Sequence, residues 1–228
     1  MPPLKTIYED DTLLVVDKPA GIAIEQLPKL TELGEECRNG IVHRLDKDTS
    51  GILLIAKTKK AFEFFQKQFQ DRNVEKKYVC LVVGTLKEKQ GAIETLLGRA
   101  GNDRRKQKTF PITDLEKQGK RTAITAYRVL QQLKDQTGQQ YTLLEATPKT
   151  GRKHQIRAHM AYLNHPIAGD KLYGFKNQPT PNELSRQFLH ATFLKVPTPP
   201  DGKTQKQFIS ELSEDLQIVL KQLQQHDN

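Results

Sequence analysis

The pattern of hydrophobic and polar positions along the chain predicts five strands, each a short apolar or alternating run. They cover residues 12–17, 52–56, 78–83, 122–130 and 141–147. The last two alternate well enough to pair with each other. A Pro/Gly turn at residues 18–21 ends the first strand, and residues 25–40 are polar and irregular.

Two segments repeat apolar residues at helical spacing and are predicted to pack on the core. Residues 60–72 carry three of their phenylalanines at helical spacing, and residues 211–223 carry four leucines and a valine on one face of a closing amphipathic helix. These residues are Phe62, Phe65, Phe69, Leu212, Leu216, Val219, Leu220 and Leu223. Because no Gly/Ser-rich linker divides the chain, we predict a single α+β domain over residues 1–228, with a mixed, mostly antiparallel sheet and flanking helices.

Charge and cysteine content limit which partners and which cell compartment we expect for the protein. Lys and Arg total 36 against 27 for Asp and Glu, a net charge of +9 that favours a nucleic acid first and an acidic membrane surface second. The alternative is a basic protein with no such partner. Cys37 and Cys80 do not have the spacing of a disulfide framework or a four-thiolate zinc site. No apolar stretch is long enough for a secretion signal or a membrane span, so we expect a cytoplasmic protein without membrane contact.

The most informative segment is residues 43–51, His-Arg-Leu-Asp-Lys-Asp-Thr-Ser-Gly. It places the carboxylate of Asp46 beside the guanidinium of Arg44 and the imidazole of His43, which can act as a base. Turn-forming residues lead from there into the strand at 52–56, so a rigid element fixes a polar loop, as at many functional sites. The alternative is a solvated turn in which Asp46 only caps the local backbone.

A second polar segment, residues 148–159, predicts a helix from about residue 153 to 163. Its core-facing stripe would consist of Ile156, Met160 and Leu163. His154 and Arg157 would share one flank of this stripe, and Gln155 and His159 would share the other. Arg157 then lies at the edge of the buried stripe, where a charged side chain needs a partner because an unpaired buried charge is very costly. A carboxylate such as Asp46 would suit it. The alternative is a basic helix face that contacts RNA phosphates or water.

A third cluster, residues 99–108, is rich in basic side chains with Gly and Asn, and Lys117, Lys120 and Arg121 add to its charge. This composition predicts a mobile loop that contacts phosphates. Many charge runs are only solvated surface, and that is the alternative here.

Taken in order, these segments resemble the RluA family of RNA pseudouridine synthases. The resemblance is carried by Lys18-Pro-Ala-Gly21, residues 43–51, Lys76-Lys-Tyr78, residues 151–159, Gly169-Asp-Lys-Leu-Tyr-Gly174 and Leu189-His-Ala191. It covers most of the chain. Since the sequence of catalytic type begins within ten residues of Met1, we expect the form of the family without an N-terminal S4 RNA-binding domain.

The resemblance implies a sheet bent around a central basic cleft, with helices outside, and it implies roles for individual residues. The implied catalytic residues are Asp46 as the essential carboxylate, Tyr78 against the uracil ring as a carrier of a proton, and Arg157 as the partner of the carboxylate. The implied substrate-binding residues are Arg44, which displaces the uridine from the RNA stack, together with His43, Leu144, Ile156, Arg152 and His154. Leu144 and Ile156 would be walls of the base pocket. Lys153 stands where the family commonly has threonine and receives no role.

The activity implied is isomerisation of uridine to pseudouridine in ribosomal or transfer RNA. The reaction breaks the N1–C1′ bond, rotates the base and rejoins it through C5, so it needs no redox cofactor, metal or nucleotide. An ionised Asp46 could attack the sugar or the base, or take the C2′ proton. We expect a uridine in a loop or single strand, because leaving the stack costs less there. With no exposed apolar face in need of a partner, we expect a monomer.

Two other functions fit parts of the sequence. A metal-dependent nuclease could use His43, Asp46, His154 and His159, but these residues lack an HExxH-type or paired-carboxylate signature. A non-catalytic RNA-binding or ribosome-assembly protein would explain the charge, but would not require Asp46, Tyr78 and Arg157 together.

Overall fold

The computed structural model describes residues 4–101, 103–116 and 118–225, and the chain divides into two compact units. The first unit consists of Met1–Lys77 and His190–Ser213, and the second of Tyr78–Leu189 and Glu214–Asn228. The single catalytic domain over residues 1–228 and the central basic cleft therefore stay predictions.

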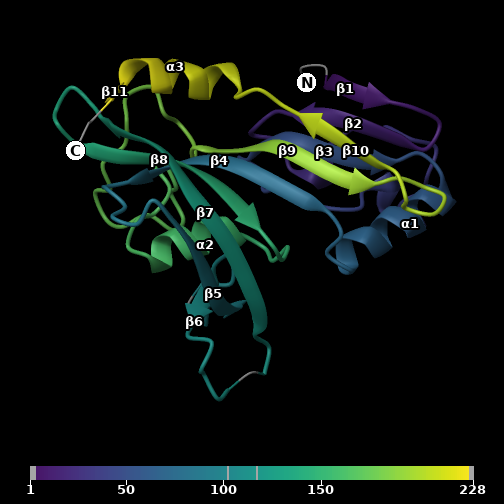
Figure 1. The fold of residues 1–228 in the computed structure, drawn as a ribbon, viewed down its shortest axis with the longest axis horizontal. Helices are drawn as coiled ribbons and strands as arrows, with labels where there is room; N and C mark the ends of the chain where they lie inside the picture. The colour runs from purple at the N-terminus through teal and green to yellow at the C-terminus, as the bar shows by residue number, and fades with distance from the viewer. Residues whose placement is uncertain (1–3, 102, 117, 226–228) are drawn as a thin grey trace. The chain divides into compact units, whose positions relative to one another are not determined.

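In its described residues, the first unit is a five-stranded sheet with one α-helix and two short 3-10 helices (Figure 1). Its elements are β1 (Lys5–Glu9), β2 (Leu13–Lys18), η1 (Ile24–Gln26), η2 (Glu35–Gly40), β3 (Ser50–Ala56), α1 (Lys59–Gln70), β9 (Leu189–Pro197) and β10 (Gln205–Ile209). The strands lie in the order β1-β2-β3-β9, and β10 pairs with β9. These pairs are antiparallel except β3 with β9, which is parallel.

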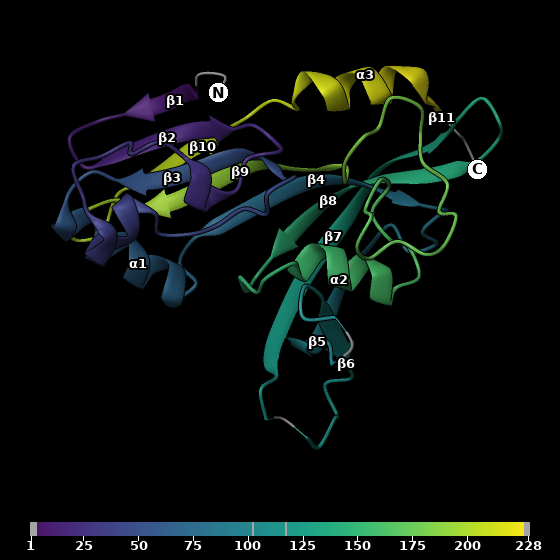
Figure 2. The same cartoon turned by 180° about the vertical axis from the view of Figure 1, so that it is seen from behind.

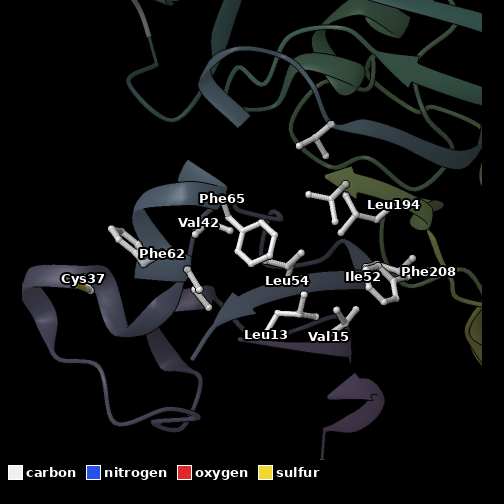
Figure 3. Close-up of a cluster of buried hydrophobic side chains, with 14 residues drawn as sticks. Leu13, Val15, Cys37, Val42, Ile52, Leu54, Phe62, Phe65, Leu194 and Phe208 are labelled. Atoms are coloured by element: carbon white, nitrogen blue, oxygen red, sulfur yellow. The ribbon is translucent and has the colours of Figure 1, made fainter. Parts of the chain in front are cut away.

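The core of the first unit lies where α1 packs on the sheet. Every residue of β3 is buried, as expected of the apolar run that β2 and β9 flank. The α1 helix begins after Thr58, whose hydroxyl accepts the Ala61 N–H. Figure 3 shows Phe65 directed from α1 toward Leu54 of β3. Phe62 and Phe65 are buried and Phe69 packs at the edge of the cluster, so the predicted core role of the phenylalanines is confirmed.

The second unit is built on strands in the order β4-β8-β7-β5-β6, with β11 on β7, and all of these pairs are antiparallel. Its elements are β4 (Glu75–Val83), β5 (Gln90–Arg99), β6 (Gln107–Phe110), β7 (Arg121–Lys134), β8 (Gln140–Pro148), α2 (Gln155–Tyr162), α3 (Glu214–Gln222) and β11 (Gln224–Gln225). The α2 helix lies against β6, β7 and β8 (Figure 2). The predicted pairing of residues 122–130 with 141–147 is confirmed in β7 and β8.

The predicted start of the closing helix was wrong. The closing helix begins at Glu214 rather than at residue 211, and Leu212 precedes it. The acidic first turn of α3 suits a helix N-terminus, and Asp215 there accepts two hydrogen bonds from Arg186. Leu216, Val219 and Leu223 are buried as predicted.

The basic cluster at 99–108 is a hairpin turn rather than wholly a mobile loop. Gly98 pairs with Lys108 and Arg99 with Gln107, so both ends of the cluster are strands. Lys120 donates to Asp114, whereas Lys117 lies outside the described residues.

Within the described residues, no helix has the length and apolar character that crossing a membrane requires.

Candidate functional site

The segment 43–51 lies in the first unit as a loop that leads into β3, and hydrogen bonds hold both of its ends. At the start, Nε2 of His43 accepts the Leu54 N–H at 2.9 Å. At the end, the Ser50 hydroxyl lies 2.8 Å from Nδ1 of the buried His190, whose Nε2 lies 3.2 Å from the Ser210 hydroxyl. The loop is therefore fixed to β3, β9 and the residue after β10.

The middle of the loop is held by the Pro/Gly turn after β2. The side chain of Lys18 is fully buried, and its ammonium donates to the carbonyls of Pro19 at 2.8 Å, Ile22 at 2.9 Å and Lys47 at 3.1 Å. The N–H of Gly21 also donates to the Lys47 carbonyl, at 3.0 Å. Because Lys47 directly follows Asp46, these contacts fix the backbone next to the candidate carboxylate.

Gly51 allows β3 and β9 to approach closely at the end of the loop. Its φ is +110°, and a Cβ there would clash with the carbonyl oxygen of Ala191. Leu45, 4% exposed, buries the apolar side of the loop. Asp46 itself is half-buried, and its carbonyl accepts the Thr49 N–H in a turn. The predicted polar loop on a rigid strand is thus confirmed, while the catalytic role of Asp46 stays a prediction.

His43 is not available as a base in this unit, contrary to the interpretation from its residue type. Burial, followed by the charges of Lys76 and Arg38, lowers the pKa of His43 to about 3. Its Nε2 lone pair accepts the Leu54 N–H, and its ring stacks on Phe69 with centroids 4.7 Å apart. His43 holds the loop in place, and its contact with substrate stays a prediction.

Arg44 differs from its neighbours because its side chain is exposed. A guanidinium nitrogen lies 3.9 Å from the carboxylate of Glu25, itself exposed, and such a pair contributes little to stability. Arg44 can therefore leave this contact at small cost.

In the second unit, Arg157 of α2 is buried and paired, as the sequence predicted of a charge at that position. Its partner there is Asp170, whose carboxylate accepts Nε at 2.7 Å and Nη2 at 2.9 Å. The side chain of Arg157 is 8% exposed and that of Asp170 is 0% exposed. The sequence did not assign this role to Asp170, although it lies in the quoted segment Gly169–Gly174. Asp46 and Arg157 belong to different units, so the ion pair predicted between them stays a prediction.

The Asp170 carboxylate stays ionised despite its burial. Burial alone would raise its pKa, but the hydrogen bonds and charge of Arg157, with the N–H groups of Tyr173 and Leu172, hold the pKa below its ordinary value. Asp170 thus presents a fixed negative charge to Arg157.

The turn before α2 is locked to β7. Oε1 of Gln155 accepts from the Thr150 hydroxyl and the Arg152 N–H, and its Nε2 donates to the Ile124 carbonyl at 2.9 Å. Nε of Arg152 donates to the Thr122 carbonyl at 3.1 Å. The helix begins at Gln155, not at residue 153 as predicted, because His154 is its N-cap residue in the left-handed region, with φ of 55°.

Three further predicted site residues, Tyr78, Leu144 and Ile156, lie in β4, β8 and α2. Tyr78 of β4 pairs with Ala146 of β8 and is half-buried. Leu144 of β8 is fully buried and Ile156 of α2 is 6% exposed. Their contacts with a base stay predictions, as do those of Arg152 and His154.

His159 is a buried residue that ties α2 to two strands. Its Nδ1 lies 2.9 Å from the Thr125 hydroxyl of β7, and its Nε2 lies 3.0 Å from the Thr95 hydroxyl of β5. Gln155 also bonds Thr125, so the predicted shared flank of Gln155 and His159 is confirmed. Burial lowers the pKa of His159 to about 4.

A pH-dependent loss of stability follows from His159. Its folded pKa lies below the unfolded value of 6.5, so the unfolded state binds the proton first and stability falls as pH drops from about 6.5 toward 4. Between pH 7.5 and pH 5.0, we expect urea unfolding to show wild type losing about 1–2 kcal/mol more than His159→Gln. An equal loss in both proteins would mean that protonation of His159 does not cause the loss of stability at low pH.

Among the residues that the structure describes, no group of three or more His, Cys, Asp or Glu side chains is placed to hold a metal ion.

Comparison with known proteins places these motifs in a family. A family model described as RNA pseudouridylate synthase matches residues 12–162. An RNA pseudouridine synthase of Aquifex aeolicus, named as uncharacterized, is 40% identical over 198 residues, which are 80% of this chain and 60% of that protein. Ribosomal large subunit pseudouridine synthase D of Nitrosomonas europaea is 37% identical over 220 residues, 88% of this chain and 60% of that protein.

The fold agrees with a solved structure. Human RNA pseudouridylate synthase domain containing 1 is 26% identical, with a TM-score of 0.77 over 98% of this chain and 89% of that one. This confirms the mixed, mostly antiparallel α+β fold. The chain spans about 60% of the length of the first curated relatives, so the absence of an S4 domain stays a prediction. The family match and these identities show that the chain belongs to the RluA family of RNA pseudouridine synthases.

Proposed function

We propose that the chain is an RNA pseudouridine synthase that isomerises specific uridines through the carboxylate of Asp46. The observation that carries the proposal is the segment 43–51, which buried contacts hold at His43, Lys47 and Ser50. A reacting group gains from a backbone fixed in advance, because less freedom is lost on the way to the transition state.

In this proposal the N1–C1′ bond of uridine breaks, the uracil turns, and C5 bonds to C1′. The hydrogen on C5 leaves to solvent and N1 takes up a proton, so the product is an isomer of the substrate. Asp46 acts on the sugar or the base, or takes the C2′ proton. Tyr78 lies against the ring and carries a proton. Arg44, exposed and weakly paired, fills the space that the displaced uridine leaves.

The substrate class follows from charge and from the relatives. A net charge of +9 suits a polyanion, and several relatives are named ribosomal large subunit pseudouridine synthase D. We therefore propose ribosomal RNA as the first substrate and transfer RNA as the second. Both cysteines are buried and unbridged, in keeping with a reducing cytoplasm.

Tritium release from ribosomal and transfer RNA labelled at C5 of uridine tests the reaction. We expect release in proportion to enzyme, intact RNA, and equal rates with and without EDTA. Carbodiimide mapping of cellular RNA with and without the gene would then locate the modified uridines. RNA cleavage that EDTA abolishes would instead indicate a metal-dependent nuclease, and binding without release would indicate a non-catalytic RNA-binding protein.

A further inference from the structure

Tyr173 lies where three elements of the second unit meet. Its ring packs against the buried cluster of Leu97 from β5, Ala123 from β7 and Ala158 from α2. The site mechanism proposed above does not use this residue. Its contacts nevertheless join the basic hairpin turn to Arg157.

The hydroxyl of Tyr173 connects the hairpin with the start of α2. It accepts the N–H of Gln107 at 2.7 Å and lies 3.1 Å from Nδ1 of His154, the N-cap residue of α2. Gln107 is the first residue of β6, directly after the turn that carries Arg104, Arg105 and Lys106. One hydroxyl group therefore contacts both the basic turn and the start of α2.

The ring and backbone of Tyr173 hold Arg157. The Arg157 guanidinium lies over the ring, 5.1 Å from its centroid. The N–H of Tyr173 donates to Oδ1 of Asp170 at 3.0 Å, the same oxygen that accepts Nη2 of Arg157. A shift of Tyr173 would thus move the guanidinium and its carboxylate together.

A second contact runs between the same elements. The Thr109 hydroxyl of β6 donates to the Ala158 carbonyl of α2 at 3.4 Å, one residue beyond Arg157. The hairpin and the helix that carries Arg157 are therefore joined at both Gln107 and Thr109.

We propose that Tyr173 is a positioning residue that couples RNA contact at the basic turn of the β5–β6 hairpin to the orientation of Arg157. The inference rests on the proposed function. When Arg104 and Lys106 bind RNA phosphates, the start of β6 becomes fixed. The Tyr173 hydroxyl, which contacts that strand, then holds His154 and Arg157 in position. Tyr173 acts through Arg157 and does not itself need to touch the uridine.

Tyr173→Phe tests the coupling, because it removes the hydroxyl and keeps the ring over Arg157 and the backbone bond to Asp170. We expect kcat for tritium release to fall about tenfold while KM for RNA changes less than about threefold. Tyr162→Phe is the matched control, since Tyr162 is an exposed tyrosine of α2, the helix that carries Arg157, and its kinetics should equal wild type. Equal kcat in wild type and Tyr173→Phe would overturn the inference.

A double-mutant cycle separates coupling from a general structural effect. The hairpin variant Arg104→Gln with Lys106→Gln should lower kcat/KM, mainly through KM. If the hydroxyl acts by passing the position of the hairpin on to Arg157, adding Tyr173→Phe to the hairpin variant should lower kcat/KM by only about twofold more. Independent sites would instead give a further loss of about tenfold. Multiplicative losses would reject the coupling even if Tyr173→Phe lowers thermal stability. A wild type without tritium release would instead refute the proposed function.

Discussion

Asp46→Asn is expected to lower tritium release by at least about 10³-fold, because it removes the carboxylate that acts on the substrate and keeps the size of the side chain. The contacts that hold the loop use the Lys47 carbonyl and the side chains of His43 and Ser50, none of which changes. The loop should therefore keep its backbone conformation. RNA binding should fall little, since phosphate contacts dominate affinity.

The matched control is Asp11→Asn, which makes the same change at an exposed aspartate of the same unit. It should leave tritium release, RNA binding and urea unfolding unchanged. Turnover like that of wild type in Asp46→Asn would discard the catalytic assignment. A loss of RNA binding as large as the loss of turnover would place Asp46 in substrate binding rather than in chemistry.

The parts of the fold with strong local patterns could be predicted from the sequence. The apolar run before Lys57 became β3, the spaced phenylalanines became α1, and alternation paired β7 with β8. Strands with charged or mixed residues were missed, namely β1, β5, β6, β9, β10 and the short β11. Several of them pair with a neighbouring strand, as β1 does with β2 and β6 with β5. Their residues lack a clear apolar run or alternation, so the local pattern of hydrophobicity does not identify them.

Lys18 shows why the candidate site could be predicted only in part. Its position before Pro19 and Gly21 reads as part of an exposed turn, and a lysine is rarely fully buried. In the structure its ammonium is satisfied by three carbonyl oxygens, one of which, that of Lys47, is 29 positions away. Only the folded chain brings these oxygens together, so no residue pattern near Lys18 predicts its burial.

The resemblance to the RluA family supplied roles that local chemistry left open. Local chemistry alone allowed Asp46 to be a turn cap and His43 to be a base. The structure shows a fixed loop and a neutral, stacked His43. It also adds Asp170 as the partner of Arg157, which the sequence could have suggested only through its position between Gly169 and Gly174.

Asp170→Ala should lower the free energy of unfolding by about 3–5 kcal/mol, because it leaves the Arg157 guanidinium buried without its bidentate partner. Urea unfolding at pH 7 would measure the change. Tritium release by the folded protein should fall as well, since Arg157 loses the group that orients it. Arg157→Ala should have both effects for the complementary reason, a buried carboxylate without its cation.

The pair of Arg186 and Asp215 is the control for the effect of burial. Its geometry is also bidentate, at 2.7 and 3.1 Å, but the Asp215 side chain is 48% exposed where that of Asp170 is 0% exposed. Because water screens Asp215, and the Arg186 guanidinium keeps its hydrogen bonds to the carbonyls of Gln187 and Leu189, Asp215→Ala should cost only about 1 kcal/mol. Equal losses from Asp170→Ala and Asp215→Ala would mean that burial does not set the strength of the Arg157 pair.

The double variant Arg157→Met with Asp170→Leu separates structure from chemistry. Apolar side chains of similar volume avoid the cost of burying two charges, so we expect the double variant to recover part of the stability that Asp170→Ala loses. It should nevertheless remain inactive if the guanidinium serves the reaction. Recovery of stability together with tritium release would reduce Arg157 to a structural residue, and the predicted ion pair with Asp46 would then have no part in catalysis.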